Sequence, residues 1–264
     1  MPNESVAPRN LTFTLIGLVA GLFAGFFGVG GGIVVVPMLM LFFHFTQRQA
    51  SITSLVAIIP TSIVAATTFL LSGSVPLNQA AFGLMIAIGS TITAPLGTWA
   101  LRTWNTTIVR WIFIVVLFNA AIHIFYQLPD RDSQLTWSLG TVVGLIGVGA
   151  IMGFASGLLG IGGGLLILPF LVLGFGVSDL TSKALSLIAM APASISGTIG
   201  SARAGVVNWH AGISLGIPMA ITSMLGVWLA TITPVAWANP LLSALLIYAV
   251  IQLIVRTIVA GRKS

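Results

Sequence analysis

The stretch "GFFGVGGGIVVVPML" occupies residues 25–39 and lies inside an apolar run, 11–43, that contains no charged residue. Three consecutive glycines, Gly30, Gly31 and Gly32, follow Gly28 and Val29 within it. Glycine is unfavourable in a helix interior and adopts backbone conformations that other residues avoid. The cluster therefore predicts a break in a helix that otherwise has the length and composition of a membrane segment.

The composition of the chain indicates whether water or lipid surrounds it. Of its 264 residues, 57% are hydrophobic and 5% are charged, and the mean hydropathy is +1.12. Soluble domains carry about 25% charged residues. Uncharged runs of about 20 residues recur along the chain, so we expect an all-α polytopic integral membrane protein. No soluble strand–helix unit surrounds the glycines, which disfavours a nucleotide-binding loop.

Three further features narrow the class. Cysteine is absent, so disulfides and thiolate ligands are excluded. The net charge of +6 comes mainly from basic residues at expected helix ends, where topology and anionic lipid explain it better than nucleic acid. The short polar N-terminus lacks the features of a signal peptide, so we expect it to belong to the mature protein.

The glycine motif occurs twice. Residues 28–37 read GVGGGIVVVP, and residues 160–169 read GIGGGLLILP, 132 positions later. At the same offset Ser54 corresponds to Ser186, and Pro60 corresponds to Pro192. The chain is therefore expected to hold two copies of one unit, residues 1–127 and 137–264, joined by a linker at 128–136.

Each copy divides in the same way. We expect a glycine-broken helical hairpin followed by three transmembrane helices. The first copy has the hairpin 11–43 and spans 50–71, 78–101 and 108–127; the second has the hairpin 137–175 and spans 182–203, 209–231 and 239–259. The segment after each glycine cluster has about 11 residues, which covers roughly half of a 30 Å hydrocarbon core.

Charge predicts the orientation of the copies. If each hairpin returns to the side from which it entered, the two copies have inverted topology. Eight of the ten basic residues then face the cytoplasm together with both termini, and only Arg131 and Lys183 lie outside. All four acidic residues are expected in loops or tails, which disfavours a dehydrated cation as substrate.

Inverted repeats with broken helices are typical of transporters whose binding site lies where the breaks meet. The half-helices that follow the glycines would direct backbone N–H groups and a partial positive charge at an anion. The residues expected to bind substrate are Gly30, Gly31, Gly32, Ile33, Gly162, Gly163, Gly164, Leu165, Ser54 and Ser186. Close helix packing is the alternative role for any glycine in a membrane helix, and the four-residue spacing of Gly17, Gly21 and Gly25 favours it.

A gate or cavity residue could come from three further positions. Arg203 ends one polar span and either anchors that span at the interface or attracts anions there. Asn119 and His123 lie one helical turn apart and either line a cavity or bond between helices. No cluster predicts a catalytic centre, a metal site or a cofactor site.

The paired "GxGGGxxxxP" hairpins, each followed by a span with serine and proline, resemble the TauE/SafE family, the sulfite exporters. The likeness covers nearly the whole chain. It implies export of small sulfur oxyanions or organosulfonates, such as sulfite or sulfoacetate, across a bacterial inner membrane.

The leading expectation is thus a multi-pass secondary transporter in that membrane, not an enzyme, that works by alternating access on a small anion. Its other expected partners are membrane lipid and, from its exposed glycine faces, a homodimer; nucleic acid is not expected. Two alternatives stay open: a permease for another small anion or a cation, and a membrane assembly factor that transports nothing.

Overall fold

The computed structural model describes residues 6–103, 107–126, 135–159, 162–202 and 207–261. Helices make up the described part of the chain apart from turns and connections, and it contains no strand. The first half holds α1 (Val6–Phe27), α2 (Gly32–Phe43), α3 (Gln47–Leu71), α4 (Leu77–Thr103) and α5 (Thr107–Tyr126). The second half holds α6 (Leu139–Leu159), α7 (Gly164–Pro169) with the π-helical continuation η1 (Phe170–Gly174), α8 (Asp179–Ala202), α9 (Trp209–Ile232) and α10 (Val235–Gly261).

Local sequence explains where the short helices begin. The residue before α2 is Gly31, with φ 72°, and the residue before α7 is Gly163, with φ 71°. This left-handed conformation is accessible to glycine and costly for residues with a Cβ. The first helix of each half therefore ends at its glycine cluster, and a short helix starts directly after it.

Caps fix the starts of two longer helices. Thr46 accepts from the Gln49 backbone N–H at 3.3 Å, while the Gln49 side chain accepts from the Thr46 backbone at 3.0 Å. This capping box begins α3. The Asn208 side chain accepts from the Ala211 N–H at 3.0 Å and begins α9.

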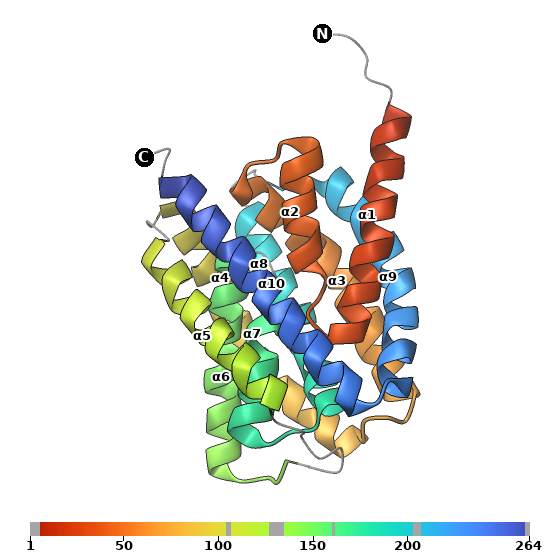
Figure 1. Ribbon diagram of the computed structural model, residues 1–264, viewed down its shortest axis with the longest axis vertical. Helices are drawn as coiled ribbons and strands as arrows, with labels where there is room; N and C mark the ends of the chain where they lie inside the picture. Colours follow the sequence, from red (N-terminus) through yellow and green to blue (C-terminus); the bar gives the residue numbers. More distant parts are fainter. Residues whose placement is uncertain (1–5, 104–106, 127–134, 160–161, 203–206, 262–264) are drawn as a thin grey trace.

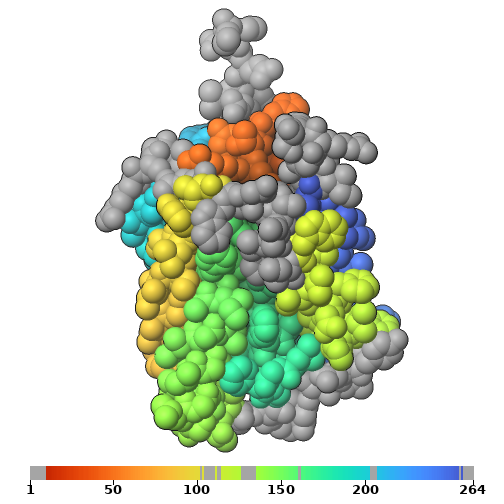
Figure 2. All heavy atoms as spheres, turned by 90° about the vertical axis from the view of Figure 1, so that its left-hand side faces the viewer, coloured from red at the N-terminus to blue at the C-terminus, as the bar shows by residue number. Residues whose placement is uncertain are grey.

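Helix packing joins the two halves along their whole length. The first helix of each half packs against the fourth helix of the other: α1 lies on α9, and α6 lies on α4. Figure 2 shows the green α6 between the yellow α4 and the teal segment that holds α7 and η1. In the centre α3 crosses α8, and at one side α5 crosses α10 (Figure 1).

The spaced glycines serve these contacts. A Cβ on Gly21 or Gly25 would fall on backbone carbonyls of α9, and a Cβ on Gly153 would fall on the Ser90 carbonyl of α4. The glycines thus let the helix backbones touch, as small residues do in membrane bundles. The packing role expected for Gly21 and Gly25 is confirmed by these contacts.

The outer surface suits a lipid environment. Large apolar side chains are exposed on most helices, among them Leu15, Ile92 and Ile221. Seven helices in the described part of the chain are long and apolar enough to cross a membrane, and α2, the described part of α5 and the α7–η1 segment are shorter apolar helices. The protein is a polytopic, all-helical membrane protein.

Candidate functional site

The two glycine breaks lie against each other in the middle of the bundle. A Cβ built on Gly164 would lie 2.8 Å from the Gly28 carbonyl oxygen and 2.9 Å from the Val29 Cα. The Val29 carbonyl lies 3.5 Å from the corresponding point on Gly162. Segments that are 132 residues apart in the sequence therefore form one centre, which also brings Ile33 and Leu165, at the starts of the half-helices, into the buried core.

Backbone conformation at this centre depends on glycine. The φ angles are 70° at Gly28, 74° at Gly30 and 72° at Gly31, and 86° at Gly162 and 71° at Gly163. Each value lies in the left-handed region. Turns that contain left-handed residues can direct backbone N–H groups into a concave surface, and such surfaces bind anions in many proteins.

The centre contains backbone N–H groups for which the described ranges provide no hydrogen-bond acceptor. In the first half-helix, the first backbone N–H that has an acceptor is that of Val34, which donates to the Gly31 carbonyl at 3.0 Å. In the second half the first such bond is from Leu166 to the Gly163 carbonyl at 3.0 Å. Within the described residues, the N–H groups of Gly30, Gly31 and Gly163 have no hydrogen-bond acceptor. Buried backbone donors normally have a partner, so these point to a polar ligand or water.

Two side chains close the space between the breaks. Ile58 of α3 and Met190 of α8 occupy equivalent positions in the repeats and are both fully buried. The Met190 methyl group lies where a Cβ on either Gly30 or Gly162 would stand, and Ile58 lies 3.4 Å and 3.0 Å from the same two points. In the sequence, the only signal that marks this pair is the repeat offset of 132.

The repeated serines bond to the protein in this structure. The Ser186 hydroxyl donates to the Gly28 carbonyl at 2.8 Å and so ties α8 to the first break. The Ser54 hydroxyl donates to the Ser51 carbonyl of its own helix at 2.8 Å. Ser51 in turn donates to the Leu159 carbonyl at the end of α6, at 2.9 Å. Both expected serines thus lie beside the breaks.

A column of polar side chains follows one face of α8. Beyond Ser186 and Met190 this face carries Ser194, Thr198 and Ser201, spaced by three or four residues. All three are buried, and none of their hydroxyl oxygens has a partner among the described residues. The column leads from the glycine centre to the end of α8. The helical spacing of these three residues is the signal in the sequence that could identify the column.

Two charged residues are buried at the start of α8. The charge pattern places Lys183 on the outer side, at the start of the expected span 182–203, and in the structure it lies in the second turn of α8 and is 1% exposed. Its ammonium lies 3.4 Å from the carboxylate of Asp179, which is 4% exposed, and 5.6 Å from the centre of the Phe26 ring. The expectation that all acidic residues occupy loops or tails was therefore wrong for Asp179. It begins a helix inside the bundle.

The other proposed gate or cavity residues do not join this centre. Asn119 and His123 are exposed on α5. Arg203 lies outside the described residues. In the described part of the chain no group of three His, Asp or Glu residues has the spacing to hold a metal ion.

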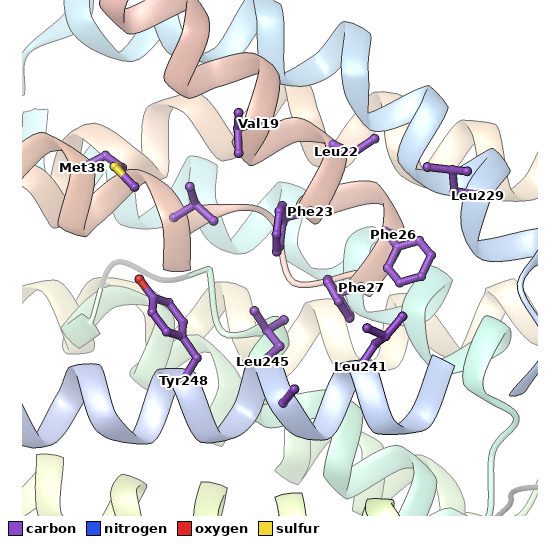
Figure 3. Close-up of a pocket in the computed structure, with 12 residues that line it drawn as sticks. Val19, Leu22, Phe23, Phe26, Phe27, Met38, Leu229, Leu241, Leu245 and Tyr248 are labelled. Carbon is purple, nitrogen blue, oxygen red and sulfur yellow. The ribbon is translucent and has the colours of Figure 1, made fainter. Parts of the chain in front are cut away.

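A large apolar cavity lies beside the first break (Figure 3). It has a volume of about 610 Å³ and is walled by α1, α2, α9 and α10. Phe23 and Phe27 project into it from α1, and Leu245 and Tyr248 project from α10. The corresponding space beside the second break, lined by Gly163 and Leu166, has only about 10 Å³. The two halves are thus packed differently, and the larger cavity offers almost no polar contact to an anion.

Comparison with known proteins identifies the family. Residues 2–124 and 145–263 match the family model described as sulfite exporter TauE/SafE. A probable membrane transporter protein of Bacillus subtilis, YunE, is 27% identical over 76% of this chain and 81% of its own. One from Methanocaldococcus jannaschii is 27% identical over 81% of this chain and 83% of its own. One from Haemophilus influenzae is 30% identical over 60% of each chain. No solved structure matches.

Proposed function

This chain belongs to the sulfite exporter TauE/SafE family, and on this premise we propose that it is a secondary transporter of small sulfur-containing anions. The substrate class is sulfite or organosulfonates such as sulfoacetate. In this proposal the protein exports the anion across the bacterial inner membrane and has both termini in the cytoplasm. The names of its relatives as membrane transporter proteins support transport rather than catalysis.

The observation that carries the proposal is the pair of apposed glycine breaks. Their buried N–H groups have no acceptor within the described ranges, and the left-handed glycines leave the backbone open to close approach. Such donors suit an oxyanion, whose several oxygen atoms accept hydrogen bonds in different directions. The anion would bind Gly30, Gly31, Gly32 and Ile33 on one side and Gly162, Gly163, Gly164 and Leu165 on the other.

The neighbouring serines would complete this site. The Ser186 hydroxyl now donates to the Gly28 carbonyl, and rotation about one side-chain bond would redirect it to a bound anion. Ser54 holds the equivalent position in the other half. A hydroxyl offers a donor at a lower desolvation cost than a charged group.

An inverted-repeat mechanism accounts for the helix contacts. A twofold relation between the halves exchanges the α1–α9 contact with the α6–α4 contact and maps the α3–α8 and α5–α10 crossings onto themselves. In Figure 1, α1 and α6 run in opposite directions, as do α5 and α10. Opposed directions are those that a twofold axis in the membrane plane would produce. Rocking of one half against the other would then expose the central site to each side in turn.

Met190 and Ile58 would separate the two sides of the path. Methionine is unbranched and flexible, so its methyl group can leave the centre without backbone movement. The buried hydroxyls of Ser194, Thr198 and Ser201 would carry the anion between the centre and the end of α8. A negative-inside membrane potential favours anion exit by about 2.3 kcal/mol per charge per 100 mV, so uniport suffices for export.

Flux into inside-out vesicles tests the proposal. Vesicles that contain the protein should take up labelled sulfite or sulfoacetate saturably, and vesicles without it should not. Sulfate and a divalent metal ion serve as comparisons. Uptake of the metal ion without the sulfur anions would contradict the proposal and favour a cation permease. No flux of any of these solutes would favour a membrane assembly factor.

A further inference from the structure

A buried cation lies directly beside the first glycine break. A Cβ on Gly28 would lie 2.7 Å from the Lys183 Cβ and 2.9 Å from its Cγ, so the lysine stem rests on the backbone of the break. The ammonium is three bonds beyond that Cγ. One turn later on the same helix, Ser186 bonds to the carbonyl of the same glycine. Lys183 and Ser186 therefore flank one point of the proposed site.

Burial makes this lysine unusual. It is 1% exposed in a helix that meets the length and hydropathy requirements of a membrane span. Removing an ammonium from water is costly, and ionisable residues inside membrane proteins commonly mark substrate or ion pathways. The equivalent position in the first half is the neutral Ser51, which bonds to the end of α6. The charge thus distinguishes one half of the site from the other.

One partner of the lysine, the Asp179 carboxylate, is near but not ideally placed. Its ammonium lies 3.4 Å from one Asp179 oxygen, beyond the 2.7–2.9 Å typical of a strong charge-assisted bond. Phe26 of α1 lies 5.6 Å away, within the range of a cation–π contact. Both contacts hold the positive charge near the break, and a better-placed oxyanion could replace the first of them.

The pair of Asp179 and Lys183 lies at the start of the proposed anion path along α8. Asp179, Lys183 and Ser186 lie on the face of α8 that continues through Met190 to the buried hydroxyls. The charged pair is on one side of Met190, and the neutral column of Ser194, Thr198 and Ser201 is on the other. The two sides of the path therefore differ in charge.

We propose that Lys183 is a specificity-determining cation of the anion site and that Asp179 occupies it until substrate arrives. This inference rests on the proposed function and adds to it. An anion that reaches the first break takes the place of the Asp179 carboxylate on the ammonium. When the anion leaves, Asp179 returns, which keeps the lysine charge compensated throughout the cycle. The substrate class is then one with net negative charge, and neutral analogues are excluded.

A simpler role is a structural ion pair that only joins two turns of α8. The two roles predict different effects of Asp179→Asn. If the carboxylate competes with substrate, its removal lowers the dissociation constant for sulfite several-fold. If the pair is structural, the same substitution lowers stability and leaves the dissociation constant unchanged.

The experiment measures sulfite and sulfoacetate binding to purified full-length protein by calorimetry, with the melting temperature without ligand as a check on folding. The neutral variant Lys183→Met/Asp179→Asn removes both charges together, so neither is left buried alone. We expect it to fold and to bind sulfite about 10- to 100-fold more weakly, the range for loss of a charged hydrogen bond. Lys183→Arg keeps the charge and should restore most of the affinity.

Ser182→Ala is the matched control, because Ser182 neighbours Lys183 and its hydroxyl makes a long hydrogen bond, 3.5 Å, to the Val177 carbonyl. It should bind like the wild type. Wild-type affinity in the folded neutral variant would overturn the role of Lys183 while leaving the proposed function intact. Failure of the wild type to bind either anion would overturn both.

Discussion

The substitution Gly30→Ala tests how the centre is packed. The three atoms nearest to a Cβ at this position all belong to side chains: the Met190 methyl carbon and sulfur, and then a methyl carbon of Ile58. The backbone has φ 74°, which costs a residue with a Cβ about 1–2 kcal/mol. Displacement of the flexible methionine adds to this cost. We expect Gly30→Ala to lower the unfolding free energy by about 1–3 kcal/mol.

The steric part of that loss should disappear when Met190 is shortened. Met190→Ala alone should cost about 2–5 kcal/mol, because the side chain is fully buried. The double variant Gly30→Ala/Met190→Ala should be more stable than the sum of the two losses implies, by about 1 kcal/mol. For a chain of this size 1 kcal/mol corresponds to about 2–4 °C in melting temperature, measured on the detergent-solubilised protein.

Gly31→Ala is the matched control. Its Cβ would lie 2.7 Å from the Ala20 carbonyl oxygen of α1, and backbone cannot move aside as a side chain can. Its loss should therefore exceed that of Gly30→Ala and should add to that of Met190→Ala within about 0.5 kcal/mol. If the coupling free energy with Met190→Ala is the same for Gly30→Ala and Gly31→Ala, or is zero for both, this description of the centre is refuted.

Other predictions concern stability. Gly153→Ala should destabilise the α4–α6 contact by more than 2 kcal/mol, because its Cβ would meet the backbone of α4. Gly147→Ala in the same helix meets nothing within 4 Å and should raise the unfolding free energy by about 0.5–1 kcal/mol. Equal melting temperatures of the two variants would contradict this. Ser186→Ala should lower the unfolding free energy by about 1–3 kcal/mol, since it leaves a buried carbonyl without its donor, and an unchanged value would show that the bond adds nothing. Asn208→Ala should cost about 1 kcal/mol through loss of the α9 cap, whereas Asn208→Ser should retain most of it in the same melting measurement.

Part of this account could be predicted from the sequence. Glycine breaks depend on local backbone preference, so the triplets and the offset between them were enough to locate both half-helices. The burial of Lys183 beside Asp179 could not be predicted in the same way, because Gly176 and Asp179 suggest a loop that ends just before the span. Only the three-dimensional packing reveals that α8 begins early and that its first turns lie against the end of α1.

The central contact also depends on long-range packing. Met190 is one of eight methionines, and nothing in its immediate sequence distinguishes it. Its importance comes from the crossing of α3 and α8, which brings it to glycines from both halves. For the same reason the acceptor of the Ser186 hydroxyl, the Gly28 carbonyl, could not be inferred from helix periodicity.

Larger residues at the glycine breaks would not test anion binding alone. Valine at Gly31 and Gly163 would block the breaks, yet each Cβ would lie 2.7 Å from a backbone carbonyl oxygen, that of Ala20 or that of Met152. Such variants would disturb helix packing as well as any bound anion. Measurements that leave the glycines in place are therefore more informative.

The most direct test of the central claim observes the glycine N–H groups themselves. In protein labelled with ¹⁵N only at glycine, titration with sulfite should shift the amide resonances of Gly30, Gly31 and Gly163 saturably, as expected for N–H groups that gain an anionic acceptor. Gly147 and Gly174, which face open space, should not shift. Saturable sulfite binding without any shift at the three central glycines would contradict the account.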